Sequence, residues 1–75
     1  MASIDAVVSW FDGKESKFLT VGGGLSPEYP DAEKFPSIMS AARAADRLRK
    51  RFPGAKKIDI IVNYGTDNEG TVYAI

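Results

Sequence analysis

The sequence contains no cysteine and no histidine. Without cysteine the chain can form no disulfide bond, no thiolate zinc site and no thiol nucleophile. Without histidine it lacks the commonest general base, the commonest transition-metal ligand and the usual side chain that titrates near neutral pH. Bare carboxylates or a buried lysine remain as catalytic groups, and no pattern in the sequence points to either. We therefore expect a non-catalytic protein that uses no cofactor and no metal ion.

Long hydrophobic runs are also missing. The longest ones, such as residues 60–62, are far too short to cross a bilayer. The first residues, Met1-Ala2-Ser3-Ile4, have neither the basic start nor the long apolar stretch of a secretory signal. The chain is 44% hydrophobic, with eight aromatic residues in 75, which is enough for one small core. We expect residues 1–75 to form a single domain of a cytoplasmic protein.

Only residues 37–52 show a sustained helical period. Apolar side chains recur there at spacings of three and four and form one stripe along a helix, at Ile38, Ala41, Ala45, Leu48 and Phe52. Ser37 is the predicted N-cap, and Pro53 disfavours helical geometry at the residue before it. The pattern predicts a helix of about fourteen residues, roughly 20 Å long.

Four other segments have the composition of strands: residues 4–11, 17–21, 57–64 and 71–75. Asp12 and Gly13 supply turn chemistry between the first two, which predicts a β-hairpin. The order β-β-α-β-β therefore predicts an α+β fold, in which one long helix packs on one face of a four-stranded, mainly antiparallel sheet.

Residues 22–36 form a long connection for so small a domain. Its glycine run, 22–24, is not followed by a helix and lacks the lysine and hydroxyl of a phosphate-binding loop, so we interpret it as a flexible strand exit. Residues 26–28 could cap one helical turn, since proline suits its first position. The connection either packs Leu25, Tyr29 and Phe35 onto the core, or it moves and carries function.

Alternation along the strands assigns side chains to the two faces of the sheet. We expect Val8, Trp10, Ile60, Val62 and Tyr73 to face the helix, and Val7, Phe11, Ile61 and Val72 to face away. One helix covers one face only. The other face would be partly apolar and open unless the long connection or a second subunit covers it, so we consider a homodimer through this face.

The charges are distributed unevenly, although the net charge is zero. Residues 43–57 contain seven basic side chains and one acid, a local net charge of +6, whereas the rest of the chain sums to −6. The predicted partner-binding residues are Arg43, Arg47, Lys50, Arg51, Lys56 and Lys57. Three interpretations are open: a solvated helix end whose cations suit the helix dipole, a surface for an acidic protein partner, or a nucleic-acid surface that contacts phosphates. We favour an acidic protein partner, with nucleic acid as the alternative.

A hairpin around Phe11-Asp12-Gly13-Lys14 precedes the alanine- and arginine-rich helix. This outline, over about half of the chain, resembles the arm-binding domains of tyrosine integrases, which are small sheet-and-helix modules that bind DNA. The chain departs from them in its long glycine- and proline-rich connection and in lacking basic strands, where that family reads DNA. The single-helix plan is also similar to small phage-encoded accessory proteins, including some anti-CRISPR proteins. These resemblances imply an accessory role in a phage or mobile element.

Overall fold

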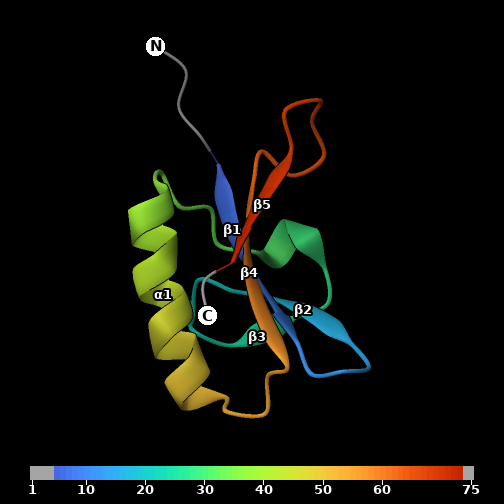
Figure 1. Ribbon diagram of the computed structural model, residues 1–75, viewed down its shortest axis with the longest axis vertical. Helices are drawn as coiled ribbons and strands as arrows, with labels where there is room; N and C mark the ends of the chain where they lie inside the picture. Colours follow the sequence, from blue (N-terminus) through green and yellow to red (C-terminus); the bar gives the residue numbers. More distant parts are fainter. Residues whose placement is uncertain (1–4, 74–75) are drawn as a thin grey trace.

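The computed structural model describes residues 5–73. Five strands form one antiparallel sheet in the order β3-β2-β1-β4-β5, and one helix packs on it (Figure 1). The elements are β1 (Ala6–Phe11), β2 (Ser16–Leu19), β3 (Leu25–Ser26), the 3₁₀ helix η1 (Tyr29–Asp31), α1 (Ile38–Arg51), β4 (Lys57–Val62) and β5 (Gly70–Tyr73). The predicted α+β fold is confirmed, with one correction: the sheet has a fifth, two-residue strand, β3, inside the predicted connection.

Helix α1 begins and ends where the sequence predicts. The Ser37 side chain accepts a hydrogen bond from the Ser40 amide at 3.1 Å, which satisfies one of the free N–H groups of the first turn. At the other end, the Trp10 indole Nε1 donates to the Phe52 carbonyl at 3.2 Å. This bond ties the end of the helix to the sheet. At 14 residues α1 is too short to span a bilayer, and no helix within residues 5–73 could do so.

The core lies between α1 and the sheet. The helix contributes small side chains and one leucine: Ala41, Ala44, Ala45 and Leu48. The sheet contributes larger apolar side chains, among them Val8, Trp10, Ile58 and Ile60. The alanines let α1 approach the sheet closely, so that the strands supply most of the apolar volume. The predicted helix-facing positions on β1 and β4 are therefore confirmed.

The register of β5 differs from the prediction. Val72 lies opposite Ile60 and Tyr73 opposite Asp59, so Val72 belongs to the face that α1 covers. Strand β2 also ends two residues early, at Leu19. The β5 error arises at an edge of the sheet, where a half-exposed strand carries little hydrophobic pattern to fix its phase. Strand β2 lies inside the sheet and ends where the chain turns toward β3, with the Thr20 N–H donating to the Gly24 carbonyl.

The connection between β2 and α1 packs onto the sheet. Thr20 pairs with Ala32 and Ala6 with Phe35 in single β-bridges, so the segment runs along the sheet at both of its ends. Leu25 and Phe35 join the helix-side core, as one of the two predicted outcomes requires, whereas the Tyr29 of that prediction packs against Phe18 and Tyr64 instead. The predicted helical turn exists as η1, with Glu28 as its N-cap, two residues later than Ser26.

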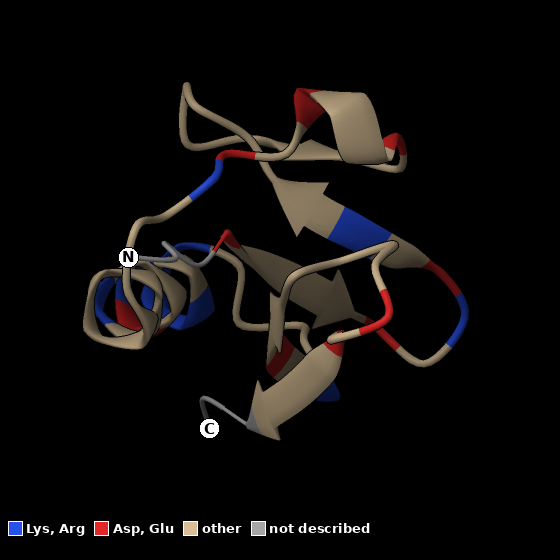
Figure 2. Cartoon of the chain, turned by 90° about the horizontal axis from the view of Figure 1, so that it is seen from above, with Lys and Arg blue, Asp and Glu red and all other residues tan. Residues whose placement is uncertain are grey.

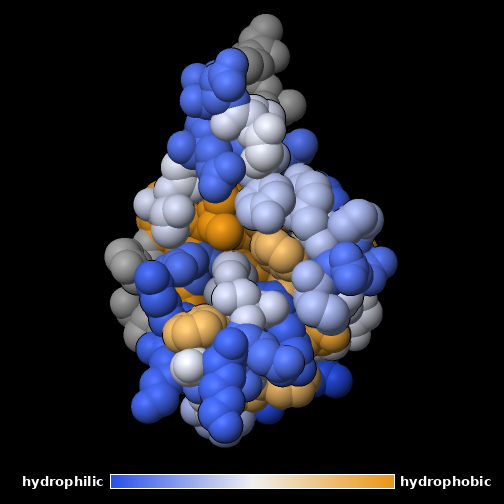
Figure 3. Space-filling model, turned by 90° about the vertical axis from the view of Figure 1, so that its right-hand side faces the viewer, coloured by the Kyte–Doolittle hydropathy of each residue, from blue (hydrophilic) through white to orange (hydrophobic). Residues whose placement is uncertain are grey.

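The connection carries η1 to the side of the sheet opposite α1 (Figure 1). There Tyr29 stacks on Tyr64 with ring centroids 4.3 Å apart, and Phe18 meets both rings edge-on. Beneath this layer Val7 is fully buried, whereas Ile61 is only half-buried. Figure 3 shows this face with a small apolar patch among polar side chains. It is thus partly covered by the chain itself, and the homodimer through it stays a prediction.

Candidate functional site

Basic residues gather on α1, while most acidic residues lie in the loops and turns around the sheet (Figure 2). On one side of the helix a single acid partly offsets the positive charges. Asp46 forms ion pairs with Arg49 at 3.3 Å and with Lys50 at 3.4 Å. All three side chains are about half or more exposed, so each pair stabilises the helix by only a few tenths of a kcal/mol.

Another side of α1 carries three arginines one turn apart: Arg43, Arg47 and Arg51, which we call the arginine row. Each is exposed, and within residues 5–73 none of them forms an ion pair with an acid. Neighbouring like charges at this spacing destabilise a helix by roughly 0.2–0.5 kcal/mol per pair. A bound anion would reduce the repulsion between these arginines, whereas in a merely solvated helix end the repulsion would remain.

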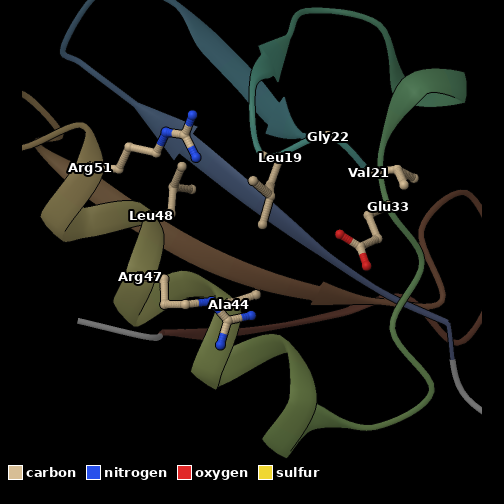
Figure 4. Close-up of a pocket in the computed structure, with 9 residues that line it drawn as sticks. Leu19, Val21, Gly22, Glu33, Ala44, Arg47, Leu48 and Arg51 are labelled. Atoms are coloured by element: carbon tan, nitrogen blue, oxygen red, sulfur yellow. The ribbon is translucent and has the colours of Figure 1, made fainter.

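A cavity of about 260 Å³ opens beside the row, between α1 and the residues that follow β2. Its apolar walls come from Leu19, Ala44 and Leu48, all of which are buried. Arg47 and Arg51 reach out from the helix along one side (Figure 4). The site therefore combines an apolar floor with two guanidinium groups.

The opposite wall belongs to the connection. The turn after β2 contributes Val21, Gly22 and Gly23. The Glu33 carboxylate points into the cavity from the segment that follows η1 (Figure 4). Gly23 has φ +85°, and a Cβ there would lie 3.1 Å from the Arg51 guanidinium. The missing side chain thus allows Arg51 to lie against the backbone of the turn. The predicted strand exit is also one wall of the cavity.

The structure does not bring all six predicted binding residues to one surface. Lys50 lies near the row but is paired with Asp46. Lys56 lays its aliphatic stem over Gly13, with its Cγ 3.3 Å from the point that a Cβ on this glycine would occupy. Lys57 is 3.6 Å from Asp59, and both belong to the face of the sheet that α1 does not cover. The predicted residues that share one surface are those of the arginine row.

Sequence reasoning missed the residues that complete the cavity. In the sequence Leu19 resembles an ordinary strand residue, Glu33 a loop acid and Gly23 a part of a flexible exit. No local signal marks them, because the cavity forms between segments that are distant along the chain. Among the residues that the structure describes, no group of three or more acids lies close enough together to hold a metal ion.

Comparisons of the chain with models of protein families, with curated protein sequences and with solved structures find no significant match.

Proposed function

We propose that this chain is a small, non-catalytic interaction module of the cytoplasm that binds an acidic segment of a partner protein through α1. The observation that carries the proposal is the arginine row beside an apolar cavity. Arg43, Arg47 and Arg51 offer charge-assisted hydrogen bonds to carboxylates, and no ion pair within the described chain already uses them.

An acidic protein segment fits this surface better than a nucleic-acid backbone does. Phosphate contacts require a broad basic surface, whereas here Asp46 and Glu33 lie on either side of the row. Lys57, which would extend such a surface, belongs to the other face of the sheet. The apolar floor at Leu19 and Leu48 would also gain nothing from a phosphodiester chain.

Nucleic acid is the second candidate, because the last turn of α1 still places Arg49, Lys50 and Arg51 together at one end of the molecule. Phosphate binding there would weaken steeply with salt and tolerate any sequence. Binding to an acidic protein would lose mainly its association rate when salt is added.

The test is an NMR titration of the labelled protein with an acidic peptide of aspartate, glutamate and glycine, and with single- and double-stranded DNA and RNA. We expect the peptide to shift amide signals along the arginine row. Arg47→Gln should weaken peptide binding by about 3- to 10-fold, as expected for the loss of one charge-assisted contact. Arg49→Gln is the matched control, since Arg49 is paired with Asp46 on another side of the same helix.

Two results would overturn the proposal. If no peptide shifts are seen even at low salt, the row is a solvated helix face. If nucleic acids bind in the micromolar range with a steep salt dependence while the peptide does not, the second candidate replaces the first.

A further inference from the structure

We infer that the cavity beside the arginine row takes an apolar side chain of the acidic partner, so that the module recognises a leucine-sized residue flanked by carboxylates. This inference rests on the proposed function and names the partner's local chemistry. A surface that bound its partner by charge alone would need no cavity between α1 and the turn after β2.

The walls of the cavity have the composition of an apolar side-chain pocket. Leu19, Ala44 and Leu48 present hydrocarbon at its floor, and Val21 stands at its rim with 78% of its surface exposed. A cavity of roughly 150 Å³ with such a lining can hold a benzene-sized molecule. The volume of about 260 Å³ here therefore accommodates a leucine side chain together with part of its backbone.

The charges around the cavity set the orientation of the segment. Arg47 and Arg51 lie along the helix side, and Glu33 points in from the other side. A carboxylate of the partner is attracted to the first wall and repelled by the second. Backbone N–H groups of the partner can donate to Glu33, as they do to carboxylates elsewhere. The segment must therefore place its acids toward α1 and keep acids away from Glu33.

Burial of the apolar residue supplies affinity that the arginines alone do not provide. Exposed charge pairs contribute little to affinity, because water and salt screen them. Removing a leucine side chain from water is worth more, and the gain is specific to side chains that fit. The arginine row then gives attraction and direction, and the cavity gives selectivity.

The experiment compares two acidic peptides of equal length and charge, one with a central leucine and one with a central glycine, by NMR titration and fluorescence anisotropy. We expect the leucine peptide to bind about 10-fold more tightly, as partial burial of its side chain implies. Its additional shifts should fall on residues that line the cavity, Leu19, Ala44 and Leu48.

Two variants fill the cavity. Gly22→Leu adds a side chain at the rim, where a Cβ meets no atom within 4 Å and the backbone φ is not in the left-handed region. Ala44→Leu adds volume from the helix wall. Both should reduce the preference for leucine toward 1-fold while the glycine peptide still binds. Gly54→Leu is the matched control, because Gly54 is equally open but lies outside the cavity.

The outcomes distinguish failure of the cavity inference from failure of the proposed function. Equal affinity of the two peptides for the unaltered protein, with binding still sensitive to Arg47→Gln, overturns the cavity inference and leaves the proposed function standing. A leucine preference that persists in both folded cavity-filling variants also overturns it. Failure of both peptides to bind at low salt overturns the proposed function itself. Amide spectra of each variant establish that it is folded before its affinity is used.

Discussion

The two faces of the sheet are covered in different ways. On one face α1 lays a row of alanines and Leu48 over large strand side chains, and Ile58 and Ile60 are almost completely buried. On the other face lie a 3₁₀ turn and three aromatic rings; Val7 is fully buried there, while Ile61 stays half-buried.

The second face also contains a buried polar atom without a hydrogen-bond partner in the described part of the chain. One carboxylate oxygen of Asp59 is 3.6 Å from the Lys57 ammonium, and the other is buried without a hydrogen-bond partner in the described part of the chain. Buried polar atoms without partners cost free energy. We therefore expect the helix side to provide most of the stability.

The largest expected effect comes from the adjacent residues Ile60 and Ile61, which point to opposite faces of β4. Ile60→Ala should reduce the free energy of unfolding by about 2–5 kcal/mol, because it leaves a cavity in the dry core. Ile61→Ala should cost about 1 kcal/mol or less, since its side chain already contacts water. Urea denaturation of both variants checks this, and equal losses would contradict the comparison.

The same pair tests the predicted homodimer. If a second copy covers the far face, the stability lost in Ile61→Ala should grow with protein concentration, because dimerisation then stabilises the folded state of the unaltered protein. Light scattering at high micromolar concentration gives the mass directly. A monomeric mass, with no concentration dependence of the unfolding midpoint, would refute the dimer.

A smaller effect is expected at the junction between α1 and the sheet. Trp10→Phe removes the indole N–H that donates to the Phe52 carbonyl and leaves that carbonyl without this partner. We expect a loss of about 1–3 kcal/mol. Amide exchange should increase in the last turn of α1 more than at Ser37, where the helix has its own cap. A uniform change along the helix would contradict this role of Trp10.

The aromatic layer on the far face should contribute less. The stacked rings of Tyr29 and Tyr64 connect the 3₁₀ turn to the segment after β4. A double-mutant cycle with Tyr29→Ala and Tyr64→Ala should give a coupling of about 0.5–1.5 kcal/mol. Additive losses, with no coupling, would mean that the two rings merely lie side by side.

The smallest effect is expected at Asp12, in the turn that joins β1 and β2. Its carboxylate accepts the backbone N–H groups of Glu15 and Lys14, each at 2.8 Å, and these bonds lower the pKa of Asp12 below its ordinary value of 3.8. A lowered folded-state pKa stabilises the protein above pH 3.8, and this contribution disappears as the pH falls through the folded-state value.

Asp12→Ala should therefore be slightly less stable than the unaltered protein at neutral pH and equally stable in strong acid. Thermal unfolding of both proteins across this pH range measures the difference. A gap that stays constant as the pH falls would contradict the role of the carboxylate charge.

Local patterns predicted the central elements well because they depend on nearby residues. The spacing of apolar residues and the Ser37 cap placed α1, and the alternation in residues 58–62 placed the faces of β4. The phase of β5 was predicted wrongly, since an edge strand receives its register from a neighbour rather than from its own pattern. The end of β2 was predicted two residues late, because the turn toward β3 is closed by a hydrogen bond between Thr20 and Gly24 that no local pattern marks.

The fold class, the bounds of the helix and the concentration of positive charge at its end could all be predicted from the amino-acid sequence. Each of these follows from periodicity, capping or composition within one segment. Tertiary packing divides residues 22–36 between the two faces of the sheet, which no local pattern predicted. It also decided which arginines share a surface and that Leu19, Gly23 and Glu33 meet them around a cavity. These contacts join segments far apart in the chain, so their geometry depends on how the whole core packs.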